Sequence, residues 1–429
     1  MSDAQVREGD RRALVRRATW LLAIAVAFIQ FTFPVFLLVA GPAAEQITGT
    51  ATSIGVVSGL YFVAAAGGAF AIGRSMDRTG RRRGLLLSIT LLVVGGVGSA
   101  WAVGRGSYPL LLLFAVPFGV ANGGANLARG AIADMYLPAE RGRAVGLVLA
   151  AGTAGAVLSS FLVGFLQDDV APRLGANPDV VPWILVPLGA VVAGVLVAAV
   201  RPDPRDLAPV APTPAGDAPV PAPAGDGAPT GHAPARSPRE LWAVPAFRLA
   251  VLAAAVGQMV MVGIMTVTPT SLHDHGHGGQ VRSIIISLHI TGMFAFAPLI
   301  GAGMDRYGRR SGLVAGFVVS IVGALAAATE SPAQGVGIGL FLIGLGWSAT
   351  YLGSTAVVSD MTAPSERAGA LGTMDLVVSL TSAVAALLGG VVLGAASYRV
   401  LSVAMAVLVL GVVLPVARLR EQLPAAARS

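Results

Sequence analysis

Residues 73–84 read Gly-Arg-Ser-Met-Asp-Arg-Thr-Gly-Arg-Arg-Arg-Gly, a short and strongly basic stretch between two long apolar segments. Residues 301–312 read Gly-Ala-Gly-Met-Asp-Arg-Tyr-Gly-Arg-Arg-Ser-Gly, nearly the same stretch 228 positions later (73 to 301). Three glycines, the methionine, the aspartate and three arginines coincide in the two copies. We therefore expect an internal repeat, with this stretch at the same place in each copy.

A second motif repeats at almost the same spacing. Residues 134–146 read Asp-Met-Tyr-Leu-Pro-Ala-Glu-Arg-Gly-Arg-Ala-Val-Gly, and residues 360–372 read Asp-Met-Thr-Ala-Pro-Ser-Glu-Arg-Ala-Gly-Ala-Leu-Gly, an offset of 226 positions (134 to 360). Two unrelated motifs that repeat at one long period indicate a chain built from two similar halves, and they are not typical of a short-period solenoid.

The composition is that of a membrane protein. The chain is 55% hydrophobic and 12% charged, with a mean hydropathy of +0.76, which lies far outside the range of ordinary globular proteins. Apolar runs of about 20 residues recur along the chain, and this is the length of helix that crosses the hydrocarbon core of a bilayer. The expected surroundings of the protein are therefore lipid.

The residue types that are absent exclude several kinds of site. Without cysteine the chain has no disulfide and no thiolate metal ligand. All basic side chains are arginine, so the lysine that a phosphate-binding P-loop needs is missing. The net charge of +7 could suit nucleic acid, but the arginines lie between apolar runs, where membrane topology explains them better. We expect neither a cofactor nor a nucleic-acid partner.

The apolar runs predict the fold class, an all-α membrane protein of two six-helix transmembrane bundles. A polar tail at residues 1–17 precedes the first bundle (18–200), and a Pro- and Ala-rich stretch at 201–245 is expected to be a disordered linker. The second bundle (246–418) is followed by a tail at 419–429. The predicted spans are 18–40, 51–72, 84–103, 109–128, 143–166, 182–200, 246–271, 282–303, 312–329, 335–356, 369–394 and 399–418.

The arginines predict the orientation of the chain. With twelve spans and the N-terminus inside, only Arg105, Arg173, Arg282 and Arg399 fall in outer segments, and every other arginine falls on the inner side. Positively charged residues are enriched on the cytoplasmic side of membrane proteins. We therefore expect both termini in the cytoplasm and the protein in the inner or plasma membrane.

The repeated motifs resemble those of the major facilitator superfamily. The pattern Gly-x-x-x-Asp-Arg-x-Gly-Arg-Arg between spans two and three, and again between spans eight and nine, is similar to the signature cytoplasmic loop of that family. The Pro-x-Glu-Arg stretches after spans four and ten resemble its second loop signature. The resemblance covers the chain apart from the linker and tails, and it implies two bundles around a central cavity that opens alternately to either side.

The resemblance also implies a latch that closes the cytoplasmic side. Physically, an aspartate at a helix end can accept hydrogen bonds from the N-terminus of a neighbouring helix, and the loop arginines can pair with carboxylates such as Glu140 and Glu366. The alternative is that these arginines only fix the topology. The candidate latch residues are Asp77, Arg78, Arg81, Asp305, Arg306, Arg309, Glu140, Arg141, Glu366 and Arg367.

Two ionisable residues inside spans are candidates for proton transfer. A charged group at mid-span costs roughly 2.5–3.5 kcal/mol, so such residues tend to be functional. His289 in span eight could take and release protons near neutrality, or could be a neutral histidine bonded to a facing helix. Asp375 in span eleven could be a proton site or an interfacial charge. Four amides could line the cavity or join helices: Gln30, Asn122, Asn126 and Gln258.

The loop after span seven carries His273, His275 and His277, which is the one local cluster with the character of a metal site. It leaves a transition-metal transporter open as an alternative, and a non-transporting membrane sensor is another.

The preferred interpretation is a monomeric secondary transporter, and not an enzyme. It would move a small neutral or amphipathic organic solute by alternating access, with proton coupling, and export is favoured slightly over import. Many drug/proton antiporters of the superfamily that the motifs resemble carry an arginine ahead of a glycine in span four and a Gly-Pro signature in span five. This chain lacks both, which weakens a drug-antiporter assignment.

Overall fold

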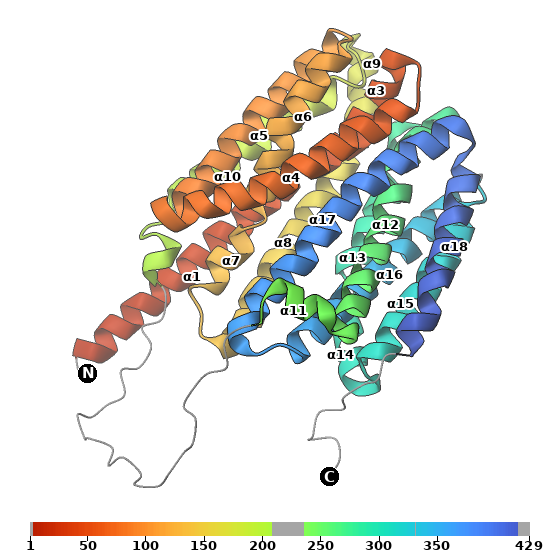
Figure 1. The fold of residues 1–429 in the computed structure, drawn as a ribbon. Coiled ribbons are helices and arrows are strands. Elements are labelled where there is room, and N and C mark those ends of the chain that lie inside the picture. Colours follow the sequence, from red (N-terminus) through yellow and green to blue (C-terminus); the bar gives the residue numbers. More distant parts are fainter. Residues whose placement is uncertain (1–2, 208–235, 331, 419–429) are drawn as a thin grey trace.

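A computed structural model describes residues 3–207, 236–330 and 332–418, and throughout these ranges the regular structure is helical, without a strand. Twelve helical segments of the described chain are long and apolar enough to cross a membrane. Figure 1 shows them in two bundles that lie side by side, α1 to α10 in one and α12 to α18 in the other. The expected all-α membrane architecture is confirmed.

The first bundle contains several spans made of more than one helix. Its first span joins four helical pieces, one of them a π-helical turn, and its fourth and fifth spans are also composite. Its elements are α1 (Asp3–Gln30), α2 (Phe33–Val35), η1 (Phe36–Ala40), α3 (Gly41–Thr48), α4 (Thr52–Thr79), α5 (Arg81–Gly104), α6 (Tyr108–Ala125), α7 (Ala128–Ala133), α8 (Pro138–Phe165), η2 (Leu166–Val170), α9 (Ala171–Leu174), η3 (Val181–Ile184) and α10 (Leu185–Ala198).

The second bundle is more regular, and only its second span is interrupted. Its elements are α12 (Pro245–Asp274), α13 (Gly279–Phe294), α14 (Ala297–Tyr307), α15 (Arg309–Ala327), α16 (Ala333–Asp360), α17 (Pro364–Ala395) and α18 (Tyr398–Ala417). The break between α13 and α14 falls at residues 295–296. Non-helical backbone at membrane depth is tolerated where protein or a cavity surrounds it.

The polar segments are more ordered than the sequence indicated. The N-terminal tail is not separate, because α1 begins at Asp3 and runs without a break into the membrane segment. Within the stretch expected to be a disordered linker, η4 (Pro204–Leu207) and α11 (Pro238–Ala243) are helical. Ser237 caps α11 by accepting a bond from the Glu240 backbone, while the Glu240 carboxylate accepts from the Ser237 backbone. Residues 208–235 and 419–429 lie outside the described residues.

The repeated basic stretch forms the same sharp turn in both bundles. Gly80 has φ +101° and ψ 156°, and Gly308 has φ +94° and ψ 156°, a region that only glycine adopts readily. A Cβ built on Gly84 would lie 2.2 Å from the Met76 side chain, so a small residue is needed there. The glycines and methionine that recur in the sequence thus have a structural explanation. We call the end of the molecule with Gly80 and Gly308 the motif end, and the other the opposite end.

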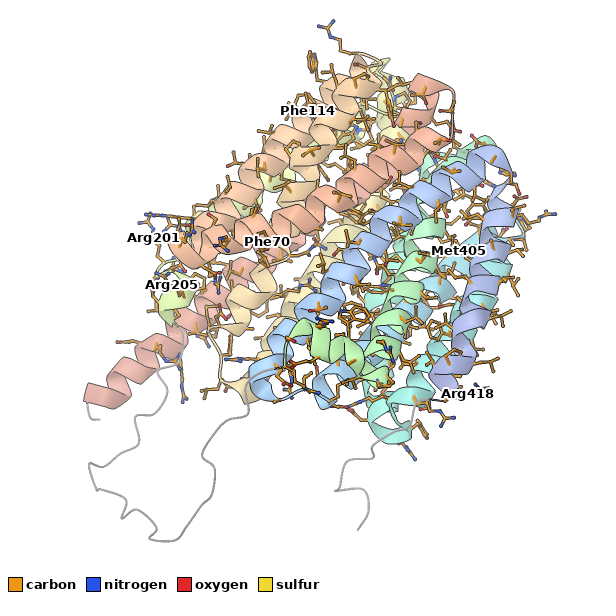
Figure 2. The ribbon with its side chains drawn as sticks, viewed as in Figure 1. Phe70, Phe114, Arg201, Arg205, Met405 and Arg418 are labelled. Carbon is orange, nitrogen blue, oxygen red and sulfur yellow. The ribbon has the colours of Figure 1, made fainter. Side chains whose placement is uncertain are left out.

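Arginines gather at the motif end. Figure 2 shows Arg201 and Arg205 at that end of the first bundle and Arg418 at that end of the second. In the same view the apolar side chain of Phe70 points outward from α4. Phe70 is 72% exposed, which suits a surface that faces lipid.

The two bundles pack closely toward the opposite end. A Cβ on Gly55 of α4 would lie 2.7 Å from the Ala386 carbonyl of α17, and a Cβ on Gly390 of α17 would lie 2.6 Å from the Gly55 nitrogen. A Cβ on Gly164 of α8 would lie 2.8 Å from the backbone of Gly279 in α13. Small residues let membrane helices approach this closely.

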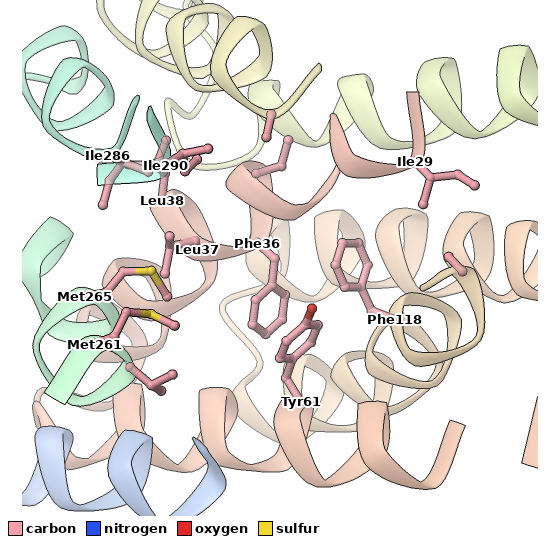
Figure 3. Close-up of a cluster of buried hydrophobic side chains, with 14 of the residues drawn as sticks. Ile29, Phe36, Leu37, Leu38, Tyr61, Phe118, Met261, Met265, Ile286 and Ile290 are labelled. Carbon is pink, nitrogen blue, oxygen red and sulfur yellow. The ribbon is translucent and has the colours of Figure 1, made fainter. Parts of the chain in front are cut away.

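A buried apolar cluster joins the bundles beside these glycine contacts. The Phe36 ring stacks on Tyr61 at 4.6 Å and on Phe118 at 5.2 Å between ring centroids. Figure 3 shows this aromatic group next to Met261 and Met265 of the second bundle. Because these side chains are almost completely buried, they close the space between the bundles on the side of the opposite end.

Candidate functional site

A cavity of about 450 Å³ lies between the two bundles. Both bundles contribute to its wall, which combines aromatic rings, amides and hydroxyls with small apolar residues. The aromatic and polar lining residues are Gln30, Phe33, Tyr61, Phe62, Asn122, Asn126, Arg129, Thr153, Gln258, Phe294, Trp347, Tyr351, Asp375, Ser379 and Ser382.

In the second bundle, hydrogen bonds hold an aromatic wall in place. The Trp347 indole N–H donates to Gln258 Oε1 at 2.6 Å, and Gln258 Nε2 donates to Ser382 Oγ at 2.8 Å. The rings of Trp347 and Tyr351 stack with centroids 5.4 Å apart and planes inclined by 12°. The Tyr351 hydroxyl donates to Asp375 Oδ1 at 2.9 Å. Three helices, α12, α16 and α17, therefore fix one flat wall of the cavity.

In the first bundle, the polar side chains of the wall have few partners. Asn122 is 4% exposed, and its Nδ2 makes no hydrogen bond within the described structure. Neither Gln30 nor Asn126 forms a side-chain hydrogen bond with the described residues, although both line the cavity. The two walls therefore differ: one is tied together by its own hydrogen bonds, and the other presents free amides.

Two ionisable groups line the cavity, one from each bundle: Asp375 of α17 and Arg129 of α7. Asp375 is exposed to this space and bonded to Tyr351, while Arg129 Nε donates to the Asn126 carbonyl at 3.3 Å. Among the candidates from the sequence, Asp375, Gln30, Asn122, Asn126 and Gln258 are brought together at this one cavity. Gln258 joins helices through Trp347 and Ser382 as well as lining the wall.

His289 lies elsewhere. It is fully buried in α13, its Nδ1 is 2.7 Å from the Leu340 carbonyl of α16, and its Nε2 has no partner among the described residues. It is not part of the cavity lining. This placement corresponds to the second interpretation given above, a histidine bonded to a facing helix, and it separates His289 from the residues that a solute could contact.

The histidines after α12 do not converge. His273 and His275 are exposed, and His275 Nδ1 lies 2.7 Å from the Ser271 carbonyl of its own helix. His277 is half-buried, and its Nε2 has no partner in the described chain. No group of three or more His, Asp or Glu residues in the described ranges is arranged to hold a metal ion. The alternate spacing in the sequence had indicated such a group, but a helix end and a turn direct the side chains apart.

The loop motifs form ion pairs within each bundle. Arg81 Nη1 lies 2.8 Å from Asp77 Oδ1, and Arg81 Nε lies 3.2 Å from Asp134 Oδ2. The second copy repeats this arrangement, since Arg309 pairs with Asp305 and, at 3.5 Å, with Asp360. The two different motifs of the first half, residues 73–84 and 134–146, thus meet in space. Their copies in the second half, residues 301–312 and 360–372, meet in the same way.

The expected pairing of these arginines with Glu140 and Glu366 is not formed among the described residues in this conformation. Glu366 is bound instead by Arg236, with contacts of 3.0 and 2.8 Å from Nε and Nη2 and 2.8 Å from the backbone nitrogen. These bonds lower the pKa of the Glu366 carboxyl to about 2. Glu140 is exposed and has no ion pair with a described residue. No local pattern indicates the pairing of Arg236 with Glu366, because 130 residues separate the partners.

The remaining loop arginines make local contacts. Arg141 donates to the Tyr136 carbonyl at 3.0 Å, and the Arg306 guanidinium lies over the Tyr307 ring at 5.4 Å. Arg78 and Arg367 are exposed, without an ion pair to the described residues. None of these contacts of the described loop arginines crosses between the bundles in this conformation.

Asp203 takes the helix-capping role that the sequence had assigned to Asp77. Its two carboxylate oxygens accept bonds from the backbone nitrogens of Arg81 and Arg82, at 3.2 and 3.0 Å, at the start of α5. A Cβ on Gly80 would lie 2.7 Å from the same carboxylate. The residue lies about 120 positions after the turn that it caps, so no local pattern could have identified it.

Residues 20–285 and 271–428 match the sequence profile of the Major Facilitator Superfamily. The chain belongs to the Major Facilitator Superfamily. It is an integral membrane transporter with twelve candidate spans among its described residues, and its relatives are transporters, not enzymes. The family signature falls where the structure has its two glycine turns.

Several transporters of the superfamily resemble this one over nearly its whole length. The uncharacterized MFS-type transporter YdeG of Bacillus subtilis is 29% identical over 91% of this chain and 89% of its own, and YddS of the same organism is 30% identical over 85% and 82%. The riboflavin transporter RfnT of Brucella anthropi is 24% identical over 90% of this chain and 92% of its own.

Solved structures show the same fold. A bacterial homologue of the human lysosomal transporter Spinster, in an inward-facing and unoccupied conformation, has a TM-score of 0.67 with 19% identity, covering 95% of this chain and 96% of its own. The nucleoside transporter NupG has a TM-score of 0.65 with 15% identity, covering 93% and 98%. These likenesses establish the fold of this superfamily member and carry no substrate.

Proposed function

We propose that this transporter moves a small, flat organic solute, neutral or amphipathic, by alternating access of the central cavity. The observation that carries the proposal is the wall formed by Trp347 and Tyr351, which are stacked and fixed by their bonds to Gln258 and Asp375. A rigid aromatic surface favours a solute with a flat ring system, because offset stacking adds to the gain from apolar burial. A cavity with only one acidic and one guanidinium group suits a solute with little charge.

Riboflavin is a suitable first probe. It is flat and uncharged, it carries several hydrogen-bond acceptors, and a relative of similar length is named as a transporter of it. The 24% identity to that relative supports a choice of probe and of solute class. It does not single out one substrate within that class.

Protons are the proposed coupling ion, with Asp375 as the site of protonation. Asp375 lines the cavity, so both a solute and solvent can reach it, whereas His289 is buried between α13 and α16. Its bond from Tyr351 links the protonation state to the aromatic wall. A carboxylate in a span that titrates during the cycle can harness about 2.3 kcal/mol per charge moved across 100 mV.

The motif end is proposed to face the cytoplasm, with both termini on that side of the cell membrane. The support is the arginine bias, since Arg81, Arg201 and Arg418 and most other arginines lie at that end. The tight packing at Gly55 and Gly390 then corresponds to closure on the outer side. Export remains the proposed direction, and the chain is proposed to act as a monomer.

The loop motifs are proposed to act in the part of the transport cycle in which the motif end is closed. Asp77, Arg81, Asp305 and Arg309 form pairs within their own bundles here, so they are available to exchange partners when the motif end closes. Such an exchange would make the loops a latch for the state closed to the cytoplasm, as the family resemblance implies.

The experiment is riboflavin counterflow and proton flux in proteoliposomes with an internal pH dye. The wild type should exchange riboflavin without a gradient and should move protons when riboflavin is added on one side. Asp375→Asn should keep exchange and lose proton flux, because the amide cannot titrate. His289→Gln is the matched control and should keep both.

Two results would contradict parts of this proposal. If the wild type exchanged neither riboflavin nor any other flat neutral solute of a panel, the solute class would be wrong. If Asp375→Asn moved protons like the wild type while His289→Gln did not, the coupling site would be His289 in spite of its burial.

A further inference from the structure

We propose that the Asn122 amide is the specificity-determining hydrogen-bonding group of the cavity, and that it selects flat solutes with a carbonyl or ring-nitrogen acceptor. This inference rests on the proposed function, because it names what the same cavity recognises. Asn122 lies on α6, across the cavity from the wall of Trp347 and Tyr351. A solute stacked on that wall would present its edge to the first bundle.

The Asn122 side chain is buried beside the cavity. It is 4% exposed, it lines the cavity, and its Nδ2 has no hydrogen-bond partner within the described ranges. A buried amide nitrogen without an acceptor is unfavourable, and such groups are rare in folded proteins. A solute acceptor in the cavity that Asn122 lines would satisfy this nitrogen.

The helix that carries Asn122, α6, is held closely against α4. A Cβ on Gly119 would lie 2.5 Å from the Tyr61 carbonyl of α4, and a Cβ on Gly123 would lie 1.9 Å from the Ala65 carbonyl. The two glycines flank Asn122 and hold α6 against α4 at backbone contact. The helix therefore cannot rotate to bring the amide to a partner in the protein, and its position is fixed for a ligand.

The other amide groups of the cavity differ from Asn122 in their hydrogen-bond partners or in their exposure. Gln258 uses both ends of its amide, on Trp347 and Ser382, and these bonds hold its side chain in the wall. Gln30 and Asn126 also have no described partner, but they are more exposed than Asn122, so water can satisfy them. Only an enclosed group discriminates strongly, because losing its partner leaves it desolvated and unpaired.

The test compares Asn122→Leu and Asn122→Ala with Leu113→Ala in the purified full-length transporter. Riboflavin is the probe, and its binding is followed by the quenching of its own fluorescence as it stacks on the aromatic wall. Both Asn122 variants should weaken binding, roughly five- to hundredfold, as expected for one lost hydrogen bond in a desolvated site. Leu113→Ala, also on α6 but 59% exposed and not among the residues that line the cavity, should change the affinity by less than threefold.

Thermal unfolding without riboflavin separates recognition from a structural role. Because the Asn122 nitrogen is unpaired in the protein, Asn122→Leu should leave the ligand-free Tm unchanged or raise it, while the increase in Tm caused by riboflavin is lost. In transport, the apparent KM should rise more than the maximal rate falls. The Ala variant, which cannot clash with α4, should show the same loss of affinity.

Three results would contradict this inference, and the last of them would also contradict the proposed solute class. Wild-type affinity in both Asn122 variants would overturn this inference and leave the proposed function intact. A fall in the ligand-free Tm with unchanged riboflavin affinity would show that Asn122 is structural and would overturn it too. Failure of the wild type to bind riboflavin or any other flat neutral solute of the panel would overturn the proposed solute class, and the inference with it.

Discussion

The carboxylate of Asp168, in the first bundle, accepts a 2.8 Å hydrogen bond from the backbone nitrogen of Gly279, the first residue of α13 in the second bundle. Its other oxygen accepts an equal bond from the Gln280 nitrogen. Asp168 therefore caps a helix of the opposite bundle, and its charge lies at the positive end of that helix dipole. Because this cap joins the bundles at the opposite end, it exists only while that end is closed.

Asp168→Ala should shift the transporter toward the state open at the opposite end. Loss of a helix cap costs about 0.5–2 kcal/mol, which corresponds to roughly a two- to thirtyfold shift in the equilibrium. The chain contains no cysteine, so Ser379→Cys provides a single reporter in the cavity. A membrane-impermeant maleimide applied from the opposite end should label this cysteine faster in the Asp168 variant.

Asp169→Ala is the control for this experiment. Among the described residues, Asp169 accepts one hydrogen bond, from the side chain of Gln280 at 2.6 Å, and its substitution leaves the cap of α13 in place. Its labelling rate should stay within a factor of two of the parent. Equal rates in the parent and in the Asp168 variant would show that the cap does not hold the bundles together.

Gly390→Ala should act on the same equilibrium through packing. The added methyl group would lie 2.6 Å from the Gly55 backbone nitrogen, and backbone at this contact cannot move aside as a flexible side chain would. Overpacking of this kind costs about 1–3 kcal/mol in the closed state. We expect slower counterflow and faster cysteine labelling from the opposite end. Gly411→Ala in α18, with no atom within 4 Å of the new methyl group, should change neither rate.

The sequence predicts the fold well because the signals for it are local. Apolar runs give the spans, and the glycine turns recur with the motifs that surround them, as at Gly80 and Gly308. The polar cavity residues could also be predicted in part, since an amide or carboxyl group inside an apolar span has few other uses. Asn122 and Asp375 were found by this reasoning.

The partners of these residues could not be predicted, because they come from distant parts of the chain. Trp347 and Gln258 are 89 positions apart and Arg236 and Glu366 are 130 apart, and nothing in either local stretch points to the other. His289 illustrates a further limit. An ionisable residue in a span draws attention, but the direction of its side chain depends on how α13 packs, which places it against α16.

Asp203→Ala should lower the stability of the first bundle. Its carboxylate caps α5 and contacts the Gly80 turn, so the variant leaves three backbone nitrogens, those of Arg81, Arg82 and Arg205, without their acceptor. The expected loss is about 0.5–2 kcal/mol in the free energy of unfolding, measured by thermal or denaturant unfolding in detergent. Asp206→Ala, three residues later and exposed, should cost little. A similar loss in both variants would contradict the capping role.

The ion pair of Glu366 and Arg236 predicts a pH dependence of stability. The Arg236 guanidinium lowers the pKa of the Glu366 carboxyl from 4.5 to about 2, so the folded protein favours the ionised form more than the unfolded chain does. A carboxyl with a lowered pKa stabilises the fold fully above its unfolded pKa, and this contribution is lost as the pH falls toward the folded pKa. The Tm difference between wild type and Glu366→Gln should therefore be constant from pH 7 to about pH 5. It should shrink steadily below pH 4.5.

Glu140→Gln is the matched control, because Glu140 occupies the corresponding position in the first half of the repeat. It follows a proline near the start of α8 as Glu366 does in α17, yet it is exposed and has no described ion pair. Its substitution should change the Tm by the same small amount at every pH. If the two variants gave parallel curves, the lowered pKa of Glu366 would contribute nothing to stability. A Tm difference that grew on acidification would contradict the ion pair itself, because protonation can only weaken the bond of this carboxylate to Arg236.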